Sequence, residues 1–132
     1  MAHRDEIIAF ADELLDAGSF RDYGPVGLQV VGADEVSKLA CGVSSSRELF
    51  ERAGAAGTQL VLVHHGLFWR NEPLLVDRRL KGRLEALFAT NLTLAAYQRR
   101  SAIIPPARPA ARIAATGEPS ERLKAPATRS AG

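Results

Sequence analysis

The chain of 132 residues has little cysteine, few aromatic residues and no long apolar run. Its one cysteine, Cys41, has no partner for an internal disulfide, which excludes the disulfide-stapled secreted class and indicates a reducing, cytoplasmic compartment. The longest aliphatic run, residues 60–63, is far shorter than the ~20 residues that cross a bilayer. Because the chain also begins with charged residues, we expect neither a signal peptide nor a membrane anchor.

Charged and aromatic residues are unevenly distributed along the chain. Residues 1–98 hold ten Lys/Arg, thirteen Asp/Glu and all eight aromatics, whereas residues 99–132 hold seven Lys/Arg, two Asp/Glu and five of the seven prolines. A segment with the composition of residues 99–132 buries too little apolar surface to offset the conformational entropy that ordering would cost. We therefore expect an α/β unit over residues 1–97 and a largely irregular, disordered tail over residues 98–132. The net charge of +2 comes from this tail and does not indicate binding to nucleic acid.

Hydrophobic periodicity predicts helices over residues 5–17, 46–56 and 78–89, and strands over residues 28–31, 38–43, 59–63 and 92–97. The alternation of strands and helices predicts a layered α/β fold, with parallel βαβ units and flanking helices. The run 60–63 is continuously apolar, so we expect it to be covered on both faces. In such sheets, ligands bind at the carboxyl ends of the strands.

Several smaller features follow from the same patterns. Asp5 is a candidate N-cap and Gly18 a candidate stop for the first helix. We expect Phe10 and Phe88 to lie in the core stripes of their helices, and Cys41 to be a small core residue. Basic residues on the helix 78–89 are typical of a solvated face, because no aromatic residue is interleaved with them as nucleic-acid binding would require.

The strongest candidate site is the pair His64 and His65, which directly follows the strand 59–63. Imidazoles favour Zn, Fe, Ni or Co over Mg or Ca. Adjacent side chains of a regular strand point to opposite faces, so a kink at Gly66 or two neighbouring ions would be needed for both to serve as ligands. The alternative is a pair of hydrogen-bonded histidines in the core or at its rim, since the sequence places no third ligand nearby.

A run of three serines, residues 44–46, follows the strand 38–43. A hydroxyl at this place resembles a nucleophile, but no nucleophile-elbow motif surrounds it. The spacing of Ser45 and Glu48 fits a capping box at the start of the next helix, which is the interpretation we favour. The helix start is also a place where an anion such as phosphate binds. Neither known phosphate-loop spacing is present among the glycines near Gly27.

These residues together resemble the NIF-three-like dinuclear-metal-centre family, whose members are named GTP cyclohydrolase 1 type 2. The resemblance covers residues 5–97, and five blocks carry it in order: residues 27–30, 42–46, 64–69 (His-His-Gly-Leu-Phe-Trp), 81–84 and 95–97. It implies an α/β fold, a hexameric ring, and two divalent cations (Zn, Fe, Ni, Co or Mn) in each site. Carried over by position, only His64 and His65 match the implied metal ligands. Trp69 and Ser44 are our candidate substrate-pocket residues.

The sequence departs from the family pattern after Tyr97. The Tyr-His-x-Pro-Leu-Asp block of the family is replaced by residues 97–102, so Ala102 stands where the resemblance implies a metal-binding aspartate. Loss of one base from a histidine codon would leave Gln98 and displace the frame behind it. We interpret residues 98–132 as wholly or partly a frameshifted end of a truncated chain. Resequencing the gene across codon 98 tests this hypothesis.

Three functions follow from these expectations. The resemblance implies metal-assisted hydrolysis of a purine nucleotide such as GTP, impaired here because the ligand set is incomplete. A non-enzymatic metal-binding or protein-interaction subunit is the alternative of a different class, and a non-functional frameshift product is the third. For a shortened chain we expect a monomer or an aggregate rather than the ring, because the strand 92–97 would lie at an open sheet edge.

Overall fold

The structure is a computed structural model that describes residues 1–19 and 24–98. Its helices are α1 (Arg4–Leu14), α2 (Arg47–Ala55) and α3 (Arg78–Ala89), with a short 3-10 helix η1 (Ala17–Ser19). Its strands are β1 (Ala2–His3), β2 (Gly27–Val30), β3 (Glu35–Val36), β4 (Leu39–Ser44), β5 (Leu60–His65) and β6 (Thr93–Ala96). The predicted irregular tail lies outside the described residues except for Gln98, and so does Ala102.

The main sheet has four strands in the order β2-β6-β5-β4. Strands β4, β5 and β6 are parallel and are joined through α2 and α3, whereas β2 is antiparallel to β6. The predicted α/β class with parallel βαβ units is thus confirmed. The short strands β1 and β3 form a separate antiparallel pair that the sequence patterns did not predict.

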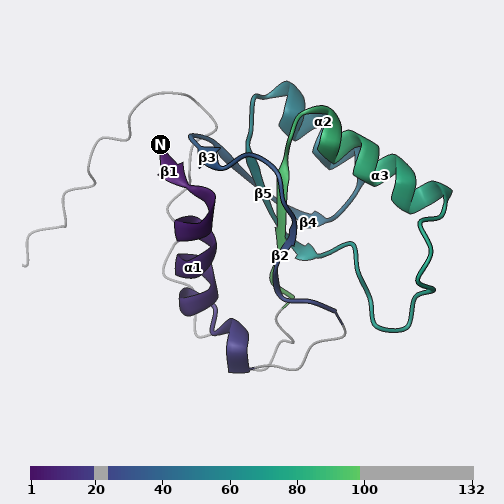
Figure 1. Ribbon diagram of the computed structural model, residues 1–132, viewed down its shortest axis with the longest axis horizontal. Coiled ribbons are helices and arrows are strands. Elements are labelled where there is room, and N and C mark those ends of the chain that lie inside the picture. Colours follow the sequence, from purple (N-terminus) through teal and green to yellow (C-terminus); the bar gives the residue numbers. More distant parts are fainter. Residues whose placement is uncertain (20–23, 99–132) are drawn as a thin grey trace, which may run out of the picture.

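Helices cover both faces of the sheet, with α1 on one face and α2 and α3 on the other (Figure 1). Under α2 and α3, Phe50 and Leu87 pack against Val61 and Leu94. Under α1, Ile8 packs against Leu60 and Ala95. Alternate residues of β5 therefore enter opposite cores, which confirms that the apolar run 60–63 is covered on both faces.

Strand β6 is not an open edge, contrary to the prediction for residues 92–97. It pairs with β5 on one side and with β2 on the other, and all four of its residues are buried. The prediction failed because nothing in the local pattern shows that the preceding segment 27–30 returns to pair antiparallel with β6. In the described part of the chain the outer strands of the sheet are β2 and β4.

The ends of α1 differ from the prediction. His3, rather than Asp5, is the N-cap, and its Nδ1 accepts a hydrogen bond from the backbone N–H of Asp5 at 3.2 Å. The helix ends at Leu14 instead of continuing toward Gly18, and Asp16 adopts a left-handed φ of 52°. Pairing of β1 with β3 brings the chain straight from a strand into the helix, which places the cap two residues earlier.

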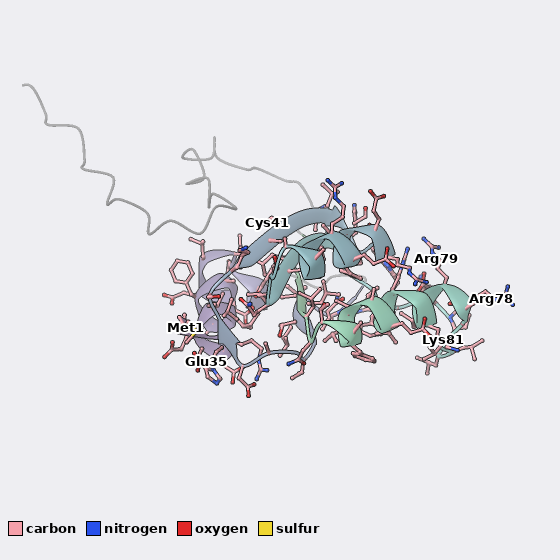
Figure 2. All side chains as sticks on the ribbon, turned by 90° about the horizontal axis from the view of Figure 1, so that it is seen from above. Met1, Glu35, Cys41, Arg78, Arg79 and Lys81 are labelled. Atoms are coloured by element: carbon pink, nitrogen blue, oxygen red, sulfur yellow. The ribbon has the colours of Figure 1, made fainter. Side chains whose placement is uncertain are left out.

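Three residues expected in the core lie on the surface. Phe10 and Phe88 are 64% and 63% exposed because they sit on helix faces turned away from the sheet. Cys41 is also exposed, since it lies on the outer strand β4, and Figure 2 shows it at the surface of the molecule. Among the described helices, none is long and apolar enough to span a membrane.

Candidate metal centre

The pair His64 and His65 forms the end of β5, which ends two residues later than the predicted strand 59–63. Both side chains are half-buried, and their ring centroids lie 4.4 Å apart with the planes at 67°. Strand alternation by itself would separate them. The structure instead brings both imidazoles together at the carboxyl end of the parallel strands, which is where the fold class predicts a site.

The other two predicted site residues lie beside the same histidine. The ring centroid of Trp69 is 5.8 Å from that of His65, with the planes tilted by 34°. Ser44 is the register partner of His65 across the β4–β5 pair, and its side chain is exposed. His64, His65, Trp69 and Ser44 therefore line one edge of the sheet; their roles as ligands and pocket residues stay predictions.

Gln29 fixes the turn that follows the histidines, a role that the sequence patterns did not predict. Its Oε1 accepts a hydrogen bond from the backbone N–H of Leu67 at 2.8 Å, and its Nε2 donates to the carbonyl of Pro25 at 2.9 Å. A Cβ on Gly66 would lie 2.3 Å from this Nε2, so only glycine lets the amide approach. No sequence signal marks the pairing, because Gln29 lies on β2 and Leu67 in the loop after β5.

The run of three serines lies next to the end of β5. The capping box predicted for Ser45 and Glu48 is wrong. Ser46, not Ser45, is the N-cap of α2, and its Oγ accepts from the backbone N–H of Leu49 at 3.1 Å. Ser45 is buried and its Oγ donates to the carbonyl of His65 at 2.7 Å. Strand β4 extends through Ser44, which moves the helix start by one residue and leaves Ser45 to tie β4 to the end of β5.

Tyr97 follows β6 at the same end of the sheet. Its backbone N–H donates to the carbonyl of Val63 at 2.9 Å, and its hydroxyl donates to Oδ1 of Asp12 on α1 at 2.8 Å. Burial raises the pKa of the Tyr97 hydroxyl well above its usual value, and the hydrogen bond to the Asp12 carboxylate raises it further. Tyr97 is therefore a neutral hydrogen-bond donor that joins the sheet to α1.

The residues present fit a metal ion only in part. His64 and His65 bring two imidazoles together, a donor type that suits divalent transition metals. Within residues 1–19 and 24–98, no group of three or more His, Cys, Asp or Glu residues is placed to hold an ion. This part of the chain thus offers two candidate ligands, fewer than the three that catalytic zinc sites typically use.

Comparison with known proteins identifies the family. Residues 2–98 match the sequence model of Duf34/NIF3 (NGG1p interacting factor 3), so the chain belongs to this family. The resemblance seen in the sequence is confirmed, and it places the paired histidines in a fold that the family shares.

Among the relatives, a GTP cyclohydrolase 1 type 2 homolog of Allochromatium vinosum is 43% identical over 94 residues, covering 70% of this chain and 36% of that protein. The homolog of Yersinia pestis is 37% identical over 92 residues, covering 70% and 37%. The crystal structure of TTHA1606 from Thermus thermophilus aligns with a TM-score of 0.69 at 34% identity, covering 73% of this chain and 40% of that one. The chain spans little more than a third of the length of these curated relatives.

Proposed function

We propose that this chain binds a divalent transition-metal ion through His64 and His65. The observation that carries the proposal is the convergence of the two imidazole rings, 4.4 Å apart, at the carboxyl end of the parallel strands. Zn, Fe, Ni, Co and Mn are the candidate ions, and two ions in each site are what the family resemblance implies. The chain has one cysteine, which fits the reducing cytoplasm in which we place this function.

For the whole protein we propose metal-assisted hydrolysis of a purine nucleotide, the activity class to which the relatives' name points. A bound divalent cation supplies an acidified water and polarises the substrate. The chain's own residues hold the ligands in place: Ser45 fixes the backbone of His65, Gln29 fixes the turn behind it, and Trp69 forms a wall beside it.

A second function, a metal-binding or interaction subunit without catalysis, is favoured by the ligand count. The described residues contribute two ligands, and two imidazoles hold an ion weakly. We therefore expect hydrolysis by this chain alone to be weak or absent. Release of formate from GTP by the metal-loaded chain, above the rate with metal alone, would support the enzyme; metal binding without formate release would support the subunit.

Calorimetric titration of the full chain with Co²⁺ and Zn²⁺ tests the metal site. We expect His64→Ala and His65→Ala each to weaken binding by about ten-fold or more, equivalent to about 1.4 kcal/mol, because each removes one of two ligands. The matched control is His3→Asn, which removes the chain's third histidine while keeping a side chain that caps α1. Equal affinities in all three variants would refute the assignment.

A further inference from the structure

A cavity of about 490 Å³ opens next to the candidate metal centre, between the segment 67–77 and the start of α3. Its wall is largely apolar, and Leu67, Trp69, Leu74 and Leu80 are among the residues that line it. Leu67 is buried, whereas Leu74 is fully exposed at the surface. The volume lies in the range of small-molecule sites, which are mostly apolar clefts with a few polar groups that orient the ligand.

Two arginines of α3 also line this cavity. Arg79 and Arg83 are four residues apart, so they lie on the same face of the helix. In the part of the chain that the structure describes, neither guanidinium forms a hydrogen bond or an ion pair with a protein group, whereas the neighbouring Lys81 pairs with Glu85. Burial lowers the pKa of Arg83, and the nearby charge of Arg79 acts in the same direction.

The cavity also contains two carboxylates, and their positions leave the arginines available. Asp77 is the N-cap of α3, where its Oδ1 accepts from the backbone N–H of Leu80 at 2.8 Å. Glu72 is exposed, and it lies close enough to act on the charge of Arg83 without forming an ion pair with it. The Asp77 carboxylate is thus occupied at the start of α3. The guanidinium groups of Arg79 and Arg83 keep their N–H donors available for a ligand.

We propose that this cavity binds a small organic anion, with its phosphate or carboxylate group on Arg79 and Arg83 and its apolar body against Trp69, Leu74 and Leu80. A guanidinium forms strong charge-assisted hydrogen bonds with either kind of anion. Because Trp69 also lies beside His65, the site adjoins the candidate metal centre. The inference deepens the proposed function by naming the side chains that would hold the anionic group of a substrate, and only the link to hydrolysis rests on that function.

Binding is tested on the full chain in the presence of EDTA, with phenyl phosphate and benzoate as the anionic probes and benzyl alcohol as the uncharged one. Calorimetry measures binding directly, and the fluorescence of Trp69, the chain's one tryptophan, reports the place. We expect saturable binding of at least one anionic probe, and binding of benzyl alcohol weaker by about ten-fold or more. Added salt should lower the affinity for the anionic probe, because it screens the charge of the arginines.

Three arginine variants locate the site. Arg83→Gln and Arg79→Gln should each lower the affinity for the anionic probe by about ten-fold. Arg78→Gln is the matched control, because this residue belongs to the same helix but does not line the cavity and projects from its end (Figure 2). Circular dichroism checks that each variant is folded, and Arg79→Gln, an exposed position, covers the case in which Arg83→Gln does not fold.

The outcomes separate this inference from the metal proposal. Retained binding in a His64→Ala, His65→Ala double variant would support the anion site whether or not the metal site exists. Absence of calorimetric binding for both anionic probes would overturn it, as would an equal loss in Arg78→Gln and Arg83→Gln, because the latter indicates only general attraction to a basic helix.

Discussion

Replacing Gly66 by alanine tests how the turn behind the paired histidines is held. A Cβ at this position would lie 2.3 to 2.6 Å from the nearest atoms of the Gln29 amide, so the amide must move. Gly66 does not have a left-handed φ, unlike Gly27 and Gly57, so backbone conformation does not require glycine there. The expected effect of Gly66→Ala therefore comes from the displaced side chain.

The size of the destabilisation follows from the backbone N–H of Leu67, which loses its hydrogen-bond acceptor. Displacement of Gln29 breaks the 2.8 Å hydrogen bond to the backbone N–H of Leu67, a residue that is 3% exposed. A buried donor left without an acceptor costs about 1–3 kcal/mol. The hydrogen bond from Gln29 to Pro25 is exposed and adds little. We expect Gly66→Ala to lower the free energy of unfolding by about 1–3 kcal/mol.

Urea unfolding followed by far-UV circular dichroism measures this change, and a double-mutant cycle identifies its cause. Gln29→Ala should cost about the same as Gly66→Ala, and the double variant should cost no more than Gln29→Ala alone, because the new methyl group then has room. Gly18→Ala is the control, since a Cβ there meets nothing within 4 Å. Additive losses in the double variant, or a Gly66→Ala chain as stable as the native one, would refute the reasoning.

Three further predictions concern the core, a helix cap and a titrating group. Leu87→Ala should lower the free energy of unfolding by about 2–5 kcal/mol in urea denaturation, because Leu87 is 0% exposed, whereas the exposed Leu74→Ala should change it by less than about 0.5 kcal/mol. Ser46→Ala should cost about 1 kcal/mol in the same assay and Ser44→Ala less, because only Ser46 caps α2. The raised pKa of Tyr97 means that the native state keeps a proton that the unfolded chain loses, so stability should fall as the pH rises above about 10; unfolding measured across this range should show a smaller fall in Tyr97→Phe.

The sequence by itself determined the class of fold and the place of the candidate metal centre. Helix 78–89 coincides with α3 because its apolar spacing and the capping Asp77 are local signals. The continuous apolar run 60–63 required cover on both faces, which α1 on one side and α2 and α3 on the other provide. The paired histidines therefore lie at the carboxyl end of a buried parallel strand, where α/β sheets carry their sites.

Only the tertiary structure decided which apolar residues are buried and which groups meet. Cys41 lies in an apolar strand segment, which predicts burial. It is nevertheless exposed, because β4 is an outer strand of the sheet. Gln29 holds the loop after β5 because β2 pairs with β6, a long-range choice that no local pattern encodes. The cavity beside Trp69 likewise arises where side chains of the segment 67–77 meet those at the start of α3. Periodicity reports which face of an element is apolar, whereas contacts between distant segments depend on the order of the strands and on how the loops close.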